Sequence, residues 1–293
     1  MTKTVEYRSQ GYFDIFWQQL RKNRMAMASL GVLAFLYLSM LFAPLIVNTV
    51  GYDYKRPYVG ERNEHPSTSH LFGTDHLGRD LFSRVLMGSR ISLTIGLVAA
   101  AISVTIGVTI GSIAGFYGGW MDNLLMRGVD VVICFPFLFL AITIVTILTP
   151  NFFNIILIIA LLSWTGIARI VRANVLSLKE REFFVAARAI GAGTSRLIFR
   201  HLLPNTMAPV IVSATLQVAG AILAESGLSY LGLGVQPPTP SWGNILMGGK
   251  PFLSSNFFYT LWPGLMIFLT VMCINFLGDG LRDALDPKIA KQR

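Results

Sequence analysis

The sequence predicts an all-α integral membrane protein with six transmembrane helices and both termini in the cytoplasm. Of the 293 residues, 53% are hydrophobic and 13% are charged, whereas soluble domains carry about 25% charged residues. The apolar residues gather in long uncharged runs, and runs of about 20 residues are typical of membrane-spanning helices. The net charge of +9 does not indicate nucleic-acid binding, because Lys and Arg follow the positive-inside pattern of a membrane protein.

Lysine and arginine are distributed unevenly between the two sides of this topology. The predicted cytoplasmic segments hold 17 of the 24 Lys and Arg residues, the outer loops hold six, and Arg90 lies at a boundary. Because positive residues are enriched on the cytoplasmic side, this asymmetry places both termini and the basic loop of residues 180–205 inside.

Residues 1–24 are predicted to form a cytoplasmic tail that contains an interfacial helix. Apolar residues recur there at i, i+3, i+4 and i+7, which is typical of a short amphipathic helix at a membrane surface: Phe13, Phe16, Trp17 and Leu20. Residues 25–50 follow as the first transmembrane helix. This run is too long for the core of a cleaved signal peptide and lacks a clear small-residue cleavage site.

Residues 51–90 are predicted to form an extracytoplasmic loop whose second half is a scaffold helix. Its polar part carries five basic and five acidic residues, and a loop without positive excess is readily placed outside. Asp80 and Arg84 stand four residues apart and can pair on a helix. His65 and His70 are expected to be solvated rather than bound to a metal.

Residues 91–282 are predicted to form a core domain of five transmembrane helices. The first of these is uncharged from residue 91 to 121, and it places four glycines on one helix face: Gly107, Gly111, Gly115 and Gly119. Small residues let helix backbones approach closely in lipid. This face is therefore predicted to pack against another helix, and a hinge is the alternative.

The uncharged stretch from residue 131 to 168 is too long for one helix of ordinary tilt. Since Pro150-Asn151 is a natural turn, we expect a third transmembrane helix at about 124–148 and a fourth at about 153–172. Pro136 is expected to kink the third helix or to define its start.

The last two transmembrane helices are expected at 206–230 and 257–277, and residues 283–293 form a cytoplasmic tail. Glu225 is the only charged residue of the fifth helix. An acid within a membrane span is costly and by default functional. We expect Glu225 to lie on the translocation pathway, to sit at a pore mouth or to cap a neighbouring helix.

Residues 180–205 form the longest charged, helix-compatible segment. Apolar residues recur at helical spacing on both sides of Gly191, which can turn the chain with a positive φ. Pro204 is expected to limit the second helix. The segment carries a basic rim: Arg181, Arg188, Arg196 and Arg200. This pattern predicts a cytoplasmic helix–turn–helix that sits in another protein's groove, and an amphipathic linker on the membrane surface is the alternative.

The chain lacks the residues of an energy-converting protein. Gly248-Gly249-Lys250 is followed by proline and has no upstream glycine at the spacing of a phosphate-binding loop. Glu225 stands alone, so the sequence shows neither a relay of buried acids nor the paired groups of a membrane-embedded enzyme. No metal-ligand cluster is evident, and Cys134 and Cys273 lie in apolar runs that favour buried free thiols. We predict a non-catalytic subunit without a cofactor, which receives energy from a partner through residues 180–205.

Four separate stretches carry a family resemblance. Ala186-Ala187, Gly191 and Leu203-Pro204 resemble the cytoplasmic coupling loop of bacterial ABC importer permeases, although Val185 replaces the usual acidic residue and His201 the usual apolar one. FGTDHLGRDLFSRVLMGSRISL, QPPTPSWG and GDGLRDALDP are similar to the C-type permease subunit of dipeptide, oligopeptide and nickel importers.

The resemblance implies the type I ABC importer permease fold in a prokaryotic cytoplasmic membrane. It also implies a homologous second permease subunit, two cytoplasmic ATPases that bind ATP and magnesium, and an extracytoplasmic substrate-binding protein. Peptides are the expected cargo, nickel or another small chelate is the alternative, and a passive channel is the alternative from a different class. The expected coupling residues are Phe183, Phe184, Ala186, Ala187, Arg188, Gly191, Arg196, His201 and Pro204.

Overall fold

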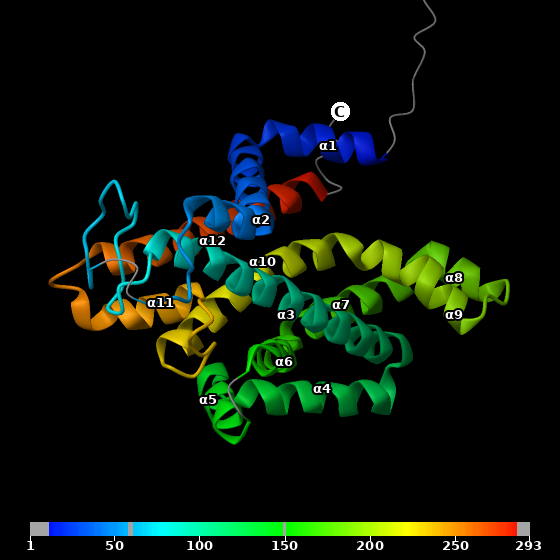
Figure 1. The fold of residues 1–293 in the computed structure, drawn as a ribbon. Coiled ribbons are helices and arrows are strands. Elements are labelled where there is room, and N and C mark those ends of the chain that lie inside the picture. The colour runs from blue at the N-terminus through cyan, green and yellow to red at the C-terminus, as the bar shows by residue number, and fades with distance from the viewer. Residues whose placement is uncertain (1–11, 58–60, 149–150, 286–293) are drawn as a thin grey trace, which may run out of the picture.

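The computed structural model describes residues 12–57, 61–148 and 151–285, and within these ranges it contains no strand. The all-α prediction is therefore confirmed. Figure 1 shows α3, α10 and α12 running along one another, with α11 and the long polar loop at one end and α8 and α9 at the other. The helices are α1 (Tyr12–Lys22), α2 (Arg24–Val50), α3 (Leu81–Tyr117), α4 (Gly119–Cys134), α5 (Phe137–Ile147), α6 (Phe152–Ser163), α7 (Thr165–Lys179), α8 (Glu182–Ala189), α9 (Thr194–Arg196), η1 (Leu197–Leu202), α10 (Leu203–Tyr230), α11 (Trp242–Gly249), η2 (Lys250–Phe252) and α12 (Phe258–Leu285).

Within the described chain, five helical segments are long and apolar enough to cross a membrane, and a bent helix pair makes a sixth. This agrees with the predicted six transmembrane segments. The five are Arg24–Val50, Leu81–Tyr117, Phe152–Lys179, Thr194–Tyr230 and Phe258–Leu285.

The predicted third span, 124–148, is not a single helix. It consists of α4 and α5, which meet at an angle of 86°. Phe135 between them has an extended backbone, with φ −96° and ψ 131°, because Pro136 disfavours helical geometry at the preceding residue and has no N–H to donate. The expected kink at Pro136 is therefore a complete break.

The predicted fourth span also differs at its cytoplasmic end. It comprises α6 and α7 and continues to Lys179 rather than ending at residue 172. The sequence interpretation ended it at Arg169 and Arg172 as charged residues. Both arginines instead have carboxylate partners on α4, Asp130 and Asp122, so the helix can continue past them.

Helix α3 begins earlier than the sequence interpretation placed it. It includes the predicted scaffold helix, so the expected boundary at residue 90 lies inside a helix about 55 Å long. The Asp80 carboxylate caps this helix by accepting the Ser83 N–H at 2.8 Å. The expected Asp80–Arg84 pair is wrong, because Arg84 Nε lies 3.5 Å from Asp75 Oδ2 instead.

Three glycines of α3 lie against α7 and the residue that precedes it. A methyl group at Gly107 would be 2.8 Å from the Trp164 carbonyl oxygen, and one at Gly115 would be 2.8 Å from Val175 Cβ. At Gly111 it would collide with the Ala168 carbonyl oxygen. Gly119, the fourth in the series, has φ +54° and starts α4 beyond a turn, so it does not belong to this face.

The polar loop before α3 folds into a cap held by buried ionic contacts. His70 is 4% exposed and its Nδ1 lies 3.0 Å from Asp80 Oδ1, so the expectation that it is solvated is wrong. The Asp75 carboxylate accepts from Arg79 Nε at 2.6 Å. His76 Nδ1 lies 2.9 Å from the Tyr259 hydroxyl of α12, and burial lowers the pKa of this histidine below its ordinary value. The cap is therefore fixed to the end of the bundle opposite α8.

The described part of the chain offers no metal site and no disulfide. It contains no group of three or more His, Cys, Asp or Glu side chains that could hold a metal ion. Both cysteines are free thiols, and Cys273 is buried as predicted, whereas Cys134 is exposed at the end of α4. His65 is exposed, and its ring makes an edge contact with Phe258.

Near the termini, α1 lies beside the end of α12 (Figure 1). Leu20 is 3% exposed, and a methyl group at Gly280 of α12 would meet Leu20 Cδ1 at 3.5 Å. Arg21 lies over the Trp17 ring at 5.1 Å from its centroid. The side chain of Phe13 lies outside the described part of the structure.

Candidate coupling surface

A buried apolar cluster holds the loop between α7 and α10. Phe184 and Ala187 of α8 are buried together with Leu197 and Leu202, which follow the turn. They pack against α7 through a set of aliphatic side chains: Ile167, Val171 and Val175. Because both arms of the loop share this cluster, the loop is packed against α7.

The turn between the two arms has the geometry of a Schellman motif. Gly191 has φ +82°, its N–H bonds to Arg188 O, and the Ala192 N–H bonds to Ala187 O. These two bonds satisfy carbonyls that the end of α8 would otherwise leave unpaired. A residue with a side chain is disfavoured at this φ, so the sequence places glycine where the turn needs it.

Pro204 does not end the second helix, contrary to the prediction from sequence. The chain is helical without a break from Thr194 to Tyr230, with a π-helical stretch at Leu197–Leu202. The Leu203 N–H bonds to Ile198 O, five residues back, so the hydrogen-bond register shifts just before the proline that has no N–H to donate. The loop therefore continues directly into the membrane-spanning α10.

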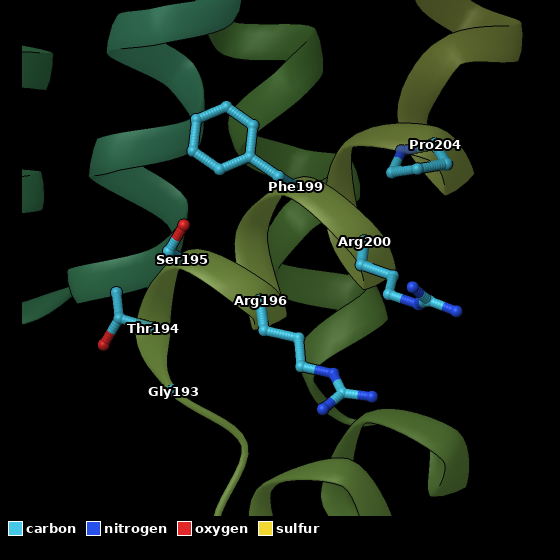
Figure 2. A pocket seen from close by; sticks show the side chains of 7 residues that line it. All are labelled: Gly193, Thr194, Ser195, Arg196, Phe199, Arg200 and Pro204. Carbon is cyan, nitrogen blue, oxygen red and sulfur yellow. The ribbon is translucent and has the colours of Figure 1, made fainter.

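The loop exposes both apolar and basic side chains. Ile190 is 86% exposed and Phe199 is 68% exposed. Figure 2 shows Arg196 and Arg200 extending to the same side of the helix and Phe199 extending to the other. They border an open hollow of about 820 Å³ that is lined by Gly193, Thr194, Ser195, Arg196, Phe199, Arg200 and Pro204.

The predicted coupling residues divide between a buried and an exposed face. Phe184 and Ala187 belong to the buried cluster and Gly191 forms the turn. His201 is half-buried, with its ring centroid 6.5 Å from that of Phe183. The exposed members are Phe183, Ala186, Arg188, Arg196 and Pro204.

The sequence interpretation missed Thr194, Ser195 and Phe199, which line the hollow. Phe199 carried a usable signal: it falls outside the helical stripe formed by Leu197, Ile198 and Leu202. An aromatic residue off the buried stripe of an amphipathic segment is exposed by geometry. Thr194 and Ser195 carried no such signal, because their position depends on how the turn folds.

Polar contacts join α7, which leads into the loop, to its neighbours. Lys179 Nζ donates to the carbonyl oxygens of Gly115 and Phe116 at 3.1 and 2.7 Å, and so caps the end of α3. Arg172 donates two hydrogen bonds to the Asp122 carboxylate of α4, at 2.5 and 2.6 Å. A displacement of the loop would therefore act on α3 and α4 together.

Glu225 lies far along α10 from this loop. Its carboxylate is completely buried and accepts hydrogen bonds from Ser92 Oγ of α3 at 2.9 Å and from Ser229 Oγ at 2.7 Å. The Ser92 oxygen also accepts the Trp242 N–H at the start of α11. Through these hydrogen bonds, Glu225 of α10 is linked to α3 and, by way of Ser92, to the start of α11.

Two solved structures of ABC transporters contain a chain with the same fold. The chain aligns with a subunit of the inward-facing MetNI methionine ABC transporter at a TM-score of 0.55 and 18% identity, covering 70% of this chain and 96% of that one. It aligns with a subunit of an amino acid ABC transporter at a TM-score of 0.51 and 14% identity, covering 69% and 92%. At such identities the comparison establishes the fold alone, which this chain shares with chains of two ABC transporters.

The sequence then gives the family. Residues 107–291 match the binding-protein-dependent transport system inner membrane component, and residues 11–66 match the N-terminal transmembrane domain of oligopeptide transport permease C. The chain belongs to this binding-protein-dependent transport permease family.

Similar relatives cover nearly all of the chain. The dipeptide transport system permease protein DppC of Alkalihalophilus pseudofirmus is 43% identical, over 93% of this chain and 89% of its own length. The oligopeptide transport system permease protein OppC of Bacillus subtilis is 42% identical, over 93% and 88%. The glutathione transport system permease protein GsiD of Escherichia coli O157:H7 is 42% identical, over 94% and 90%.

Proposed function

We propose that this chain is the permease subunit of an ATP-driven importer that carries short peptides across the prokaryotic cytoplasmic membrane by alternating access. The observation that carries the proposal is the exposed surface of residues 180–205, where Phe199 is open to solvent and lines the same hollow as Arg196 and Arg200. Large apolar side chains exposed beside basic ones on a loop with a packed interior are typical of a protein–protein contact.

The proposed partners are two cytoplasmic ATPases that bind ATP and magnesium, a homologous second permease subunit and an extracytoplasmic binding protein. Closure of the ATPases on nucleotide would displace α8 and α9. The displacement would pass to α3 and α4 through Lys179 and the Asp122–Arg172 pair. A difference of about 5.5 kcal/mol in binding free energy between two states is enough to move a population from about 1% to about 99%.

The named coupling residues have different tasks in this proposal. Phe184 and Ala187 transmit force into α7 because they are packed on it. Phe183, Arg188 and Arg196 are exposed and would contact the ATPase groove. Gly191 keeps the two arms at a fixed angle.

Short peptides are the proposed cargo because the relatives named above transport dipeptides, oligopeptides and glutathione, all of which contain peptide bonds. Import of nickel or another small chelate by the same machinery is the alternative. Competition for uptake by unlabelled dipeptide and by nickel chelate, in cells carrying the complete transporter, distinguishes the two cargoes.

Cross-linking tests the docking surface. In a chain whose two native cysteines are replaced by serine, cysteine at Arg196 or Thr194 should capture a nucleotide-hydrolysing protein, because both positions line the open hollow. Cysteine at Gln18, exposed on α1, is the matched control and should capture none. Failure of both loop positions to capture an ATPase contradicts the proposal, as does passive peptide flux through the purified chain alone in liposomes.

The turn provides a functional test. Gly191→Val should abolish ATP-driven uptake while membrane insertion stays normal, because a β-branched residue at φ +82° costs about 1–3 kcal/mol and displaces one arm. Gly191→Asn, which tolerates this backbone region, is the control and should retain most uptake. Wild-type uptake by the valine variant would show that the turn geometry is not required.

A further inference from the structure

A hollow of about 310 Å³ lies at the opposite end of the molecule from the coupling surface, between α2, α3 and the start of α6. Arg90 is its cationic lining residue. Apolar side chains and three hydroxyl-bearing residues complete the lining. These are Met40, Met87, Ile91, Phe152 and Pro240, with Tyr54, Thr94 and Thr239.

Arg90 has no charged partner within the described part of the chain, where no ion pair or side-chain hydrogen bond involves it. It is exposed and is followed by 31 residues without a charge. A guanidinium at the edge of the hydrocarbon is costly unless an anion or water satisfies it. Arg90 is therefore free to pair with an anion from outside the described part of the chain.

The hydroxyls of Tyr54, Thr94 and Thr239 are also unused in the described structure, although the chain positions two of these residues. Arg84 Nη1 donates to the Tyr54 carbonyl oxygen at 2.9 Å, and Asn244 Nδ2 donates to the Thr239 carbonyl oxygen at 2.8 Å. Tyr54 and Thr239 are thus held through their carbonyl oxygens, so their hydroxyls remain available for a ligand. The guanidinium can only donate hydrogen bonds, whereas the three hydroxyls can donate or accept them, so an acceptor group can satisfy all four.

The neighbouring charges do not oppose an anion. Asp53 lines the adjacent hollow, on the other side of Tyr54, and its carboxylate accepts the Lys55 N–H at 2.9 Å. The Lys55 ammonium lies 5.4 Å from the centroid of the Tyr54 ring. Among the residues that line the hollow, Arg90 is the one that carries a charge, so the lining is positive.

We propose that Arg90, Tyr54, Thr94 and Thr239 bind the phosphate of an outer-leaflet phospholipid, whose glycerol and acyl portion lies against the methionines, Ile91 and Phe152. Phosphate oxygens match the planar fork of arginine. The apolar half of the lining distinguishes this ligand from a free anion. The outer position follows from the opposite, cytoplasmic placement of residues 180–205.

Native mass spectrometry of the full-length chain in detergent, titrated with palmitoyl-oleoyl-phosphatidylglycerol, tests the site. The wild type should show one tight lipid adduct. Arg90→Gln should weaken that adduct about tenfold or more, and Thr94→Val, which keeps the shape and the charge, about threefold. Arg56→Gln removes an exposed cation of the same outer loop that does not line the hollow, and should bind as the wild type does.

Three outcomes overturn the proposal. If Arg90→Gln and Thr94→Val both bind the lipid as tightly as the wild type does, the hollow is not the binding site. Arg56→Gln can weaken binding as much as Arg90→Gln, which would indicate general charge attraction. Displacement of the lipid by millimolar alanyl-alanine, but not by glycerol phosphate, would assign the site to a cargo carboxylate. Gel filtration of each variant establishes that it is folded.

Discussion

Gly111 is the residue at which the contact between α3 and α7 leaves no room for a side chain. A methyl group there would collide with the Ala168 carbonyl oxygen, which belongs to helical backbone and cannot move aside as a side chain can. The same face carries Gly107 and Gly115, each with a neighbour closer than van der Waals distance to the position of a methyl group. The close approach of two backbones is thus set by single atoms.

We expect Gly111→Ala to lower the free energy of unfolding by about 1–3 kcal/mol, since overpacking forces helices apart. Thermal unfolding in detergent, followed by gel filtration with fluorescence detection, measures the effect. Gly220→Ala in α10 is the control, because nothing lies within 4 Å of the methyl position there. Alanine should be neutral or slightly stabilising at that site. Equal loss in both variants would show that the α3–α7 contact is not special.

At the scale of elements, the features that depend on residues within one segment could be predicted from the sequence. The positive φ of Gly191 and the break beside Pro136 follow from backbone rules that act within a few residues. The start of α3 was also local, since Asp80 precedes the helix as an N-cap. The spacing of Asp80 and Arg84 predicts an i,i+4 ion pair, but in the structure the Asp80 carboxylate caps the helix.

Other elements depend on partners that are distant in sequence. The continuation of α7 past Arg172 requires Asp122, 50 residues earlier. Burial of Glu225 requires Ser92, 133 residues earlier. Neither pairing can be read from spacing in one segment. Of the candidate surface, the sequence located the loop and its turn, but not the hollow, because the hollow is shaped by the π-helical stretch before Pro204.

The ion pair between α4 and α7 provides a test at this scale. The Asp122 and Arg172 side chains are 12% and 35% exposed and make two hydrogen bonds, so a double-mutant cycle with Asp122→Asn and Arg172→Gln should give a coupling energy of about 1 kcal/mol. The Asp130–Arg169 pair joins the same helices but is about half exposed on both sides. Its coupling should be about 0.5 kcal/mol or less.

Chemical denaturation of the four variants of each cycle provides these energies. A larger coupling energy for the Asp130–Arg169 pair would show that burial does not decide which pair stabilises the contact between α4 and α7 more. If uptake falls with Asp122→Asn and is restored by exchanging the two charges, the pair also transmits movement of the loop.

Across the whole molecule, the two ends are stabilised by separate clusters. The end that carries α11 is packed around Trp242, Ile245 and Tyr259, whereas the loop end is packed around Val171 and Phe184. Helix α3 contacts both ends, through Ser92 at one and Gly115 at the other. The bundle can therefore transmit movement along α3 while each end keeps its own packing.

This separation predicts a local response to a change at Glu225. Glu225→Leu removes the acceptor of the Ser92 and Ser229 hydroxyls, and each buried donor left without a partner costs about 1–3 kcal/mol. Amide hydrogen exchange should become faster in α11, whose first N–H depends on the oriented Ser92 hydroxyl. Exchange in α8 should stay unchanged, because its buried residues belong to the cluster at the loop end and not to the one around Trp242.

Glu225→Gln keeps one acceptor oxygen, so its exchange rates in α11 should fall between those of Glu225→Leu and the wild type. Faster exchange in α8 to the same extent as in α11 would mean that both ends unfold as one cooperative unit.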